Sequence, residues 1–317
     1  MKKFLLLLVL SILAITAAAC GSAEQEDKGD SNADSGESAE TITVEHELGE
    51  TEVPKNPKKV VVFDYGILDT LDKLGIEAAG VAKGNIPAYL EKYESDDFEN
   101  IGSLKEPDFE KIAEIDPDVI IISGRQATVY DQLTELAPTI HLGVDTARYM
   151  ESFKENMNKI GEIFDKQSEV EKELAAIEES IASLNEKTSA ADQNALIILS
   201  NDDKISAYGP NSRFGLIHDV FGVPAVDDSI EASTHGMNVT FEYVMEQDPD
   251  LLYVVDRTAV VGGESSAKQI VENELVKNTK AYKNDNIVYL DPDFWYLSGG
   301  GLVSVAEMVN EIDASIK

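Results

Sequence analysis

Arginine is scarce in this chain, and its positions indicate a site for an anion. The 317 residues include only four arginines beside 22 lysines. Arg125 and Arg257 stand at matching places in two copies of one segment, and Arg213 lies between them in the sequence. A guanidinium carries a permanent charge and several fixed hydrogen-bond donors. Three such groups brought together would hold a large anion.

The segment that precedes two of these arginines occurs twice. Residues 107–120 and 239–252 share Phe-Glu, a helical stretch, Asp-Pro-Asp and an apolar run, and in each copy an arginine follows eight residues after the proline. Each copy predicts an amphipathic helix that ends at Asp-Pro, then a buried parallel strand with the arginine at its carboxyl end. Ligands of open α/β sheets bind at that edge. Two facing lobes would direct both arginines into one cleft; the alternative is two unrelated surface arginines.

The elements that must position these arginines alternate between strand and helix. In the first half, the apolar pattern predicts strand 58–63, helix 67–74, helix 109–115, strand 119–123, helix 128–136 and strand 139–142. In the second half, it predicts strand 195–200, helix 212–221 with Ser212 as its cap, helix 240–247, strand 251–255, helix 267–274, strand 287–290 and helix 301–316. Such alternation is typical of a parallel α/β layer.

A long stretch without proline separates the two halves. Its apolar stripes predict a helix that ends near residue 164 and a second helix over residues 166–188, roughly 30 Å long; a coiled coil is the alternative. The predicted fold is therefore α/β, with two Rossmann-like lobes at 41–165 and 189–317. Their sheets are parallel-rich, a single long helix joins them, and the ligand cleft lies between them. Lobes joined by a helix should close only slightly around a ligand.

The amino terminus has the features of a lipoprotein signal. The chain begins Met-Lys-Lys, continues with 12 apolar residues at 4–15, and reaches Cys20 through a run of small residues. An apolar run this short fits a secretory signal rather than a membrane span. We expect residues 1–19 to be removed and Cys20 to be lipidated; an ordinary cleaved signal with a stray thiol is the alternative. The small, polar and acidic residues of 20–40 predict a flexible tether.

Composition excludes several classes of function. The formal net charge is −34, and removal of residues 1–19, which hold two lysines and no acids, makes it −36. Such a chain would be repelled by nucleic acid and by anionic lipid surfaces. The single cysteine excludes an intramolecular disulfide. The sequence has no Gly-x-Ser-x-Gly, His-Glu-x-x-His or P-loop motif, so we expect no enzymatic activity.

Several segments carry a resemblance to a known family. Besides the lipoprotein start, they are GSLKEPDFE at 102–110, YGPNSRFG at 208–215, ASTHG at 232–236 and WYLSGGG at 295–301. Together they resemble the iron-siderophore-binding lipoproteins of ABC importers, with the greatest likeness to the petrobactin-binding branch. The resemblance covers nearly the whole mature chain and implies the same helix-linked, two-lobe architecture. A haem- or cobalamin-binding lipoprotein of the same fold is the alternative, although it would have less need of three cleft arginines.

The resemblance implies a role for each matched position. Arg125, Arg213 and Arg257 match three arginines that surround the anionic iron–catecholate centre in this branch. His235 and Tyr296 match a pair that completes the coordination of ferric iron when a siderophore supplies too few donors, and imidazole and phenolate both suit that metal. Without the resemblance, His235 would be interpreted as a hydrogen-bonded loop histidine and Tyr296 as a half-buried aromatic.

The resemblance also implies partners and a location. Glu110 and Glu242, equivalent in the internal repeat, match glutamates that dock on the two permease subunits; acidic residues are also common in first helical turns because they favour the helix dipole. A ferric siderophore would be the transported ligand, with no permanently bound cofactor. The expected molecule is a monomer, anchored by lipid at the extracellular face of a Gram-positive cytoplasmic membrane, that delivers its ligand to an ABC permease and its ATPase.

Overall fold

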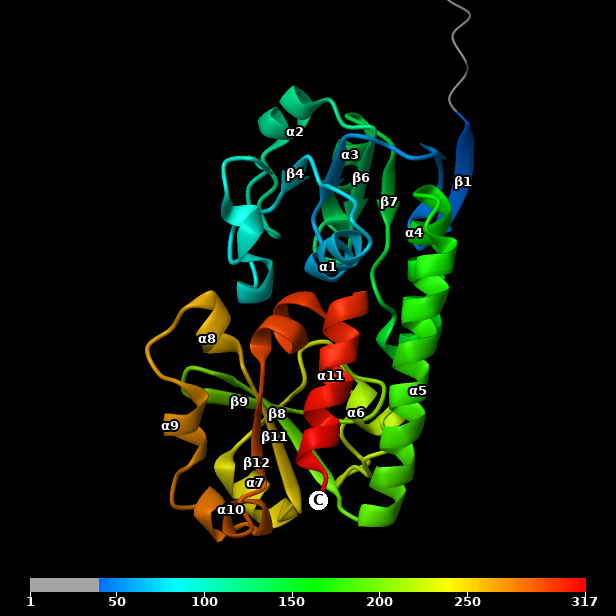
Figure 1. Cartoon of the computed structure of the whole chain (residues 1–317). Helices are drawn as coiled ribbons and strands as arrows, with labels where there is room; N and C mark the ends of the chain where they lie inside the picture. Colours follow the sequence, from blue (N-terminus) through cyan, green and yellow to red (C-terminus); the bar gives the residue numbers. More distant parts are fainter. Residues whose placement is uncertain (1–39) are drawn as a thin grey trace, which may run out of the picture. The chain divides into compact units, whose positions relative to one another are not determined.

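The computed structural model describes residues 40–317 (Figure 1). The predicted signal peptide, Cys20 and all of the predicted tether up to residue 39 lie outside this range. Ala39–Lys317 hold together as one unit through their own contacts. The two lobes described below both belong to this unit.

The first lobe is built on a parallel five-stranded sheet. Its strand order is β5-β4-β3-β6-β7, and every neighbouring pair is parallel. The strands are β3 (Val60–Val62), β4 (Gly80–Val81), β5 (Glu99–Asn100), β6 (Val119–Ile122) and β7 (Thr139–His141). The helical segments are α1 (Tyr65–Lys73), η1 (Ala88–Glu94), α2 (Phe109–Ile115), η2 (Ala127–Val129), α3 (Tyr130–Thr134), η3 (Thr146–Arg148) and α4 (Tyr149–Ile163). The central strands β3 and β6 are wholly apolar and wholly buried, as expected of a sheet covered on both faces.

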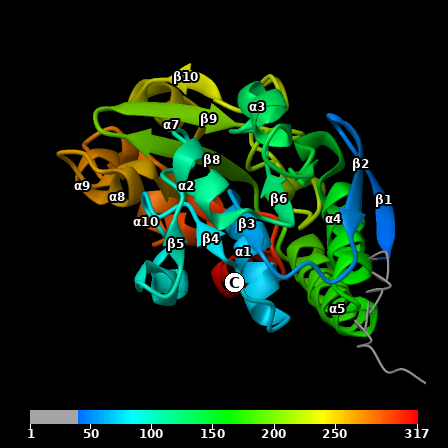
Figure 2. The ribbon, with the colours of Figure 1, turned by 90° about the horizontal axis from the view of Figure 1, so that it is seen from above.

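An antiparallel hairpin precedes this sheet. It consists of β1 (Thr41–His46) and β2 (Gly49–Pro54), and it packs against β7. Figure 2 shows it at the side of the first lobe, next to α4. Only Val44 and Val53 of the hairpin are buried, because most of the other residues of both strands are polar. The sequence analysis did not predict these two strands.

The second lobe has a mixed five-stranded sheet. Its order is β10-β9-β8-β11-β12; β8, β11 and β12 are parallel, whereas β9 pairs antiparallel with both of its neighbours, β8 and β10. The strands are β8 (Ala195–Asn201), β9 (Lys204–Tyr208), β10 (Met237–Val239), β11 (Leu251–Asp256) and β12 (Ile287–Leu290). The helical segments are α6 (Leu216–Asp219), α7 (Phe241–Gln247), α8 (Arg257–Val261), α9 (Ala267–Val271), η4 (Val276–Asn278), α10 (Lys280–Lys283), the π-helical η5 (Asp293–Ser298) and α11 (Leu302–Ser315). The predicted α/β class with parallel-rich sheets is confirmed.

The internal repeat folds as two matching helix–strand units. Helices α2 and α7 each begin after a capping side chain, Asp108 or Thr240, that accepts a backbone hydrogen bond. Each helix ends at an aspartate in the left-handed region, Asp116 with φ 53° and Asp248 with φ 44°. Aspartate tolerates this conformation better than most residues, and the following proline cannot continue a helix. The buried strands β6 and β11 follow and deliver Arg125 and Arg257 to equivalent sheet edges.

The predicted helix over 212–221 is wrong in its first turn. Only α6, Leu216–Asp219, is helical, and its cap is Gly215 rather than Ser212. Asn211 has φ 58°, and the Ser212 hydroxyl donates to the Gly209 carbonyl at 2.5 Å, so the segment 209–215 forms a turn. The Ser212 side chain therefore fixes the turn and is not available to cap a helix.

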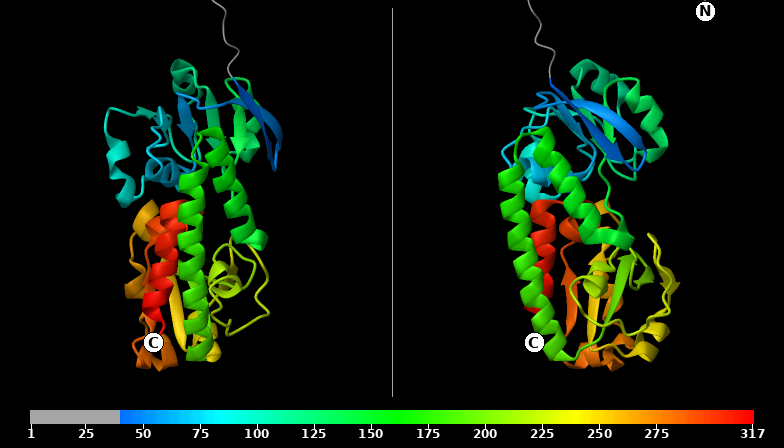
Figure 3. Two further views of the ribbon diagram at one scale, coloured as in Figure 1. Left: turned by 45° about the vertical axis from the view of Figure 1, so that its right-hand side comes forward. Right: turned by 90° about the vertical axis from the view of Figure 1, so that its right-hand side faces the viewer.

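A helix of 25 residues, α5 (Gln167–Ala191), follows α4 in the chain and precedes β8. Asp165, between α4 and α5, has φ 52°, and this left-handed residue separates the two helices. Helix α5 packs against α4 and against α11, and Figure 3 shows these helices side by side. Among residues 40–317, no helix combines the length and the apolar character needed to cross a bilayer.

The lobes also meet where α1 packs against the start of α11. Asp69 and Thr70 of α1 accept the first free N–H groups of α11: Leu302 donates to Thr70 Oγ1 at 3.0 Å, and Val303 and Ser304 donate to the Asp69 carboxyl at 3.2 and 3.1 Å. These groups would otherwise be buried without partners.

Two glycines allow this contact between α1 and α11. A Cβ atom on Gly66 would lie 2.9 Å from the Gly299 carbonyl oxygen and from the Gly301 nitrogen, and a side chain on Gly301 would collide with the Gly66 carbonyl. The backbones of the two lobes therefore touch directly at this junction.

Candidate functional site

A pocket of about 710 Å³ is lined by residues of both lobes. All five of the predicted ligand-binding residues line it: Arg125, Arg213, His235, Arg257 and Tyr296. Arg125 follows β6 and Arg257 follows β11, so both enter from the carboxyl ends of parallel strands. The structure thus brings together residues that are up to 171 positions apart in the sequence.

The three guanidiniums converge on Tyr296. Arg213 and Arg125 donate to its backbone carbonyl at 2.7 and 3.4 Å, and Arg257 Nε donates to its phenolic oxygen at 2.8 Å. The Arg213 guanidinium also lies 4.3 Å from the centre of the Tyr296 ring, within the range of a cation–π contact. Each guanidinium has five N–H donors, so most of them are left for a ligand.

Local structure orients each of these side chains. Arg257 begins α8, which Asp256 caps by accepting the Ala259 N–H at 3.2 Å, and Asn201 Oδ1 accepts a bond from Arg257 at 2.5 Å. Tyr296 lies in the π-helical turn η5, a geometry that is frequent at functional sites. The backbone of Arg213 donates to the Ser233 carbonyl at 3.4 Å and so ties it to the loop that carries His235.

The three arginines have no carboxylate partner among the described residues, although the chain has 60 acidic residues. The fourth arginine, Arg148, lies outside this group and forms ion pairs with Asp145, Glu151 and Glu155. Burial lowers the pKa of Arg213, and the like charge of Arg125 lowers it further. Asp64 is the one acidic residue in the lining, it forms no ion pair with these arginines, and burial raises its pKa. The pocket therefore holds an excess of positive charge, which an anion would stabilise.

The phenol of Tyr296 is shifted towards its anionic form. Burial alone would raise its pKa, but the hydrogen bond from Arg257 and the charges of Arg213 and Arg257 outweigh burial and lower the pKa below the ordinary value for tyrosine. A phenolate oxygen is a good ligand for ferric iron. Deprotonation of Tyr296 therefore costs less free energy here than in a free tyrosine.

His235 is exposed on the loop before β10, and its backbone N–H donates to Ser233 Oγ at 3.1 Å. The other described histidines, His46, His141 and His218, do not line the pocket. Within residues 40–317, no three or more His, Cys, Asp or Glu side chains lie close enough together to hold a metal ion.

The sequence analysis missed several residues of the site. Lys105 lines the pocket from the first lobe, and Asn201 holds Arg257 from the end of β8. Asn201 ends the parallel strand β8. Its place at the carboxyl edge of the sheet could have indicated a site residue, as it did for Arg125 and Arg257. Trp295, in contrast, belongs to the segment 295–301 that carries the resemblance; this residue, the only tryptophan of the chain, lines the pocket and donates to Glu311 at 2.6 Å.

Glu110 and Glu242 lie away from this pocket. Each is exposed in the first turn of its helix, α2 or α7. Neither lines the 710 Å³ pocket, although Glu242 borders a separate pocket of about 460 Å³. Both carboxylates are exposed at equivalent places in the two repeats.

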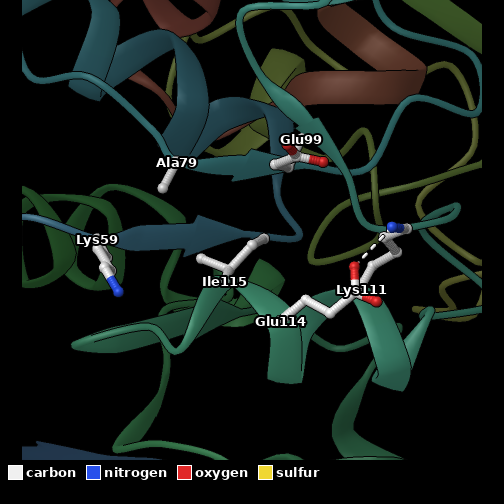
Figure 4. Close-up of a pocket in the computed structure, with 6 residues that line it drawn as sticks. All are labelled: Lys59, Ala79, Glu99, Lys111, Glu114 and Ile115. Carbon is white, nitrogen blue, oxygen red and sulfur yellow. Dashed lines mark hydrogen bonds and ion pairs between the residues drawn. The ribbon is translucent and has the colours of Figure 1, made fainter.

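Another pocket, of about 420 Å³, lies between α2 and the β4–β5 edge of the first sheet (Figure 4). Its charged lining consists of two lysines and two glutamates, Lys59, Lys111, Glu99 and Glu114. Lys111 and Glu114 neutralise each other in an ion pair of 2.6 Å. None of the predicted site residues lines this pocket, and its balanced charge favours no particular ion.

Comparisons with known proteins agree with this architecture. The family model for periplasmic binding proteins matches residues 60–294. The chain is 52% identical over 316 residues to the petrobactin-binding protein YclQ of Bacillus subtilis, with 98% of each chain covered. The crystal structure of YclQ matches with a TM-score of 0.86 and 54% identity, over 88% of this chain and 99% of that one.

Two further relatives are more distant. The periplasmic catecholate-siderophore binding protein VctP of Vibrio cholerae has a TM-score of 0.83 and 37% identity, over 87% of this chain and 100% of that one. The ferric-anguibactin-binding protein FatB of Vibrio anguillarum is 32% identical over 277 residues, with 86% of each chain covered. On the strength of the family match and of these relatives, the chain belongs to the periplasmic binding protein family.

Proposed function

We propose that this protein captures a ferric catecholate-type siderophore of the petrobactin kind outside the cytoplasmic membrane and delivers it to an ABC permease for iron uptake. Capture is reversible, and no catalytic step is involved. The observation that carries the proposal is the group of three guanidiniums without carboxylate partners at one pocket. The names of YclQ and VctP, which refer to petrobactin and to catecholate siderophores, support this choice of ligand.

A ferric ion wrapped by catecholate oxygens is a large anion with many acceptors. At an effective dielectric constant of 20, two unit charges about 4 Å apart attract each other by about 4 kcal/mol before desolvation is subtracted. Arg125, Arg213 and Arg257 can therefore hold the chelate through its oxygens without touching the metal. The negative field of the chain as a whole is screened over about 8 Å at physiological ionic strength, so the local cluster dominates inside the pocket.

The fluorescence of Trp295 gives a direct test of this function. Ferric petrobactin and ferric 3,4-dihydroxybenzoate complexes should quench it in a saturable manner, because the only tryptophan lines the pocket. Calorimetry with the gallium chelates, which have the same charge, separates binding from optical absorption by iron. A response to haem or cobalamin without any response to the ferric chelates would contradict the proposal.

We further propose that Tyr296 and His235 bind iron directly when the siderophore leaves coordination sites open. With a ferric complex of four donor atoms, the wild-type protein should show a visible phenolate-to-iron charge-transfer band. Tyr296→Phe should abolish that band and weaken binding by about tenfold, whereas a fully coordinated chelate should lose much less. His235→Ala should weaken binding of the four-donor complex without removing the band. An unchanged spectrum in Tyr296→Phe would exclude the phenolate as a ligand.

Glu110 and Glu242 are proposed to dock on the two permease subunits. The double variant Glu110→Ala, Glu242→Ala should bind the ferric chelate as tightly as the wild type but should support less than about a tenth of its iron uptake in cells. Glu179→Ala, a change of an exposed glutamate on α5, serves as the control for lost surface charge. Normal uptake by the double variant would remove both residues from the docking surface.

Cys20 is proposed to carry the lipid that anchors the protein at the extracellular face of the membrane. Multiple acyl chains on one residue give stable anchoring. Cys20→Ser should therefore shift the protein from the membrane fraction to the medium, as measured by immunoblotting. Retention of that variant at the membrane would show that another feature anchors it.

A further inference from the structure

A side pocket adjoins the arginines on the antiparallel edge of the second sheet. It has a volume of about 190 Å³ and shares Arg213, Arg257 and Tyr296 with the larger pocket. The residues that line the side pocket but not the larger pocket come from β8, β9 and β10, and they include Asn201, Lys204, Ser206 and Asn238. A ligand held by the arginines could therefore extend a substituent into it.

The alternation of strand β9 explains how this pocket is formed. Lys204, Ser206 and Tyr208 line it, whereas Ile205 and Ala207 point to the opposite face and are buried in the core of the second lobe. In the first sheet, the equivalent places in the strand order are held by β4 and β5, which are parallel and only two residues long. The side pocket is thus a feature of one lobe and not of the internal repeat.

The lining of the side pocket attracts anions. It contains no aspartate or glutamate, although the chain has 60 of them. Among the described residues Lys204 forms no ion pair; Asp203 and Glu242 line a separate pocket that Lys204 also borders. Ser206 Oγ donates to Asn238 Oδ1 at 3.3 Å, which leaves the Asn238 amide N–H groups as free donors. An ammonium and an amide donor that line the same pocket are suited to a carboxylate.

We propose that the side pocket binds a carboxylate that the ferric chelate carries away from its iron centre, with Lys204 as the charge partner and Asn238 as a hydrogen-bond donor. Lys204 is then a specificity residue, since it selects chelates with a peripheral carboxylate over chelates without one. This inference rests on the proposed function and adds the chemical class of the group that the ligand presents beside the arginines.

The test compares two probes that differ only at the periphery: the ferric complex of 3,4-dihydroxybenzoate and that of its methyl ester, each in alkaline buffer with excess chelator. Lys204→Gln should weaken binding of the acid form by about fivefold and of the ester by less than about twofold, the upper range for a partly exposed ion pair. Asn238→Asp, which adds a carboxylate to the pocket, should also weaken the acid form selectively. Lys172→Gln changes an exposed lysine on α5 that forms no ion pair among the described residues, and it should affect both probes alike.

The outcomes separate the two claims. If both probes bind the wild-type protein and Lys204→Gln weakens them equally or not at all, the side-pocket assignment is wrong and the proposed function stands. If neither probe binds the wild-type protein, the proposed function fails and the side-pocket assignment fails with it. A selective loss in Lys204→Gln that Lys172→Gln reproduces would assign the effect to net charge and would likewise overturn the role of Lys204.

Discussion

Replacement of Arg213 with alanine is expected to weaken capture of a ferric catecholate chelate at least tenfold. The Arg213 guanidinium is largely enclosed and packs against the Tyr296 ring at 4.3 Å. A hydrogen bond to a charged group contributes about 1.5–3 kcal/mol, which corresponds to roughly a 10-fold to 150-fold change in Kd. Calorimetric titration of the wild-type protein and the variant with the same gallium chelate measures the change.

The chain offers a matched control for this experiment. Arg148→Ala removes the same side chain, but Arg148 is already paired with three carboxylates and does not line the pocket. We expect its affinity to stay within about twofold of the wild type. Arg213→Lys should recover only part of the affinity, because an ammonium lacks the fixed fork of donors. Unchanged affinity in Arg213→Ala, with a normal melting curve, would remove this residue from the site.

Loss of the Asp69 carboxyl is expected to produce the largest change in stability. Asp69 is itself fully buried, so Asp69→Ala leaves the Val303 and Ser304 N–H groups without their acceptor and leaves the Tyr89 hydroxyl with Ser298 Oγ alone. Each unsatisfied buried donor costs about 1–3 kcal/mol, so the free energy of unfolding should fall by about 3 kcal/mol or more. Urea unfolding measures it. Asp131→Ala, at an exposed position in the first turn of α3, should change it by less than about 0.5 kcal/mol.

The same carboxyl should make stability depend on pH. Burial raises the pKa of Asp69 to about 7, whereas an aspartate in the unfolded chain titrates near about 4. The folded state therefore binds the proton more tightly, and the stability from this group is fully present below about pH 4 and is lost as pH rises through about 7. Asp69→Asn should flatten this part of the profile of unfolding free energy against pH. An identical slope in the wild type and Asp69→Asn would show that other groups cause it.

The repeat was the most predictable part of the fold. Both copies of Phe-Glu…Asp-Pro-Asp fold as expected, and helix α2 has the bounds that were predicted for it. Here propensity, periodicity and the stop signal at Asp-Pro all favour the same structure, and local rules are then sufficient. For the same reason, the two strands that Arg125 and Arg257 follow were predicted close to their observed positions.

The errors lie where tertiary contacts decide the local structure. The turn at 209–215 depends on the hydroxyl of Ser212 and on a hydrogen bond from the Asn211 N–H to Asp219, which no helical pattern reveals. Strands β9 and β10 are short and polar on their pocket face, so their apolar signal is weak. The antiparallel pairing of β9 with β8 and β10 could not be inferred from the first lobe, because the equivalent strand β4 pairs parallel with both of its neighbours.

Residue type was enough to predict which side chains meet at the pocket, but it did not reveal the lining residues whose position matters more than their type. Arginine is rare enough in this chain for each one to be informative, whereas Lys105 and Lys204 are two among 22 lysines. No feature of the sequence distinguishes these two lysines from the other lysines, except that they lie in a loop or at the end of a strand. The arrangement of the three guanidiniums around Tyr296 depends on the π-helical turn at 293–298, and no sequence pattern predicted this turn.

The direct meeting of glycine backbones between α1 and α11 limits how far the two lobes can move towards each other. A Cβ atom on Gly66 or on Gly301 would collide with the other backbone, so these peptide groups already touch and cannot approach further. The empty and the occupied forms should then have nearly the same outline. On the proposed function, an ABC permease would therefore recognise the loaded protein through the chelate itself, which changes the charge at the opening of the pocket.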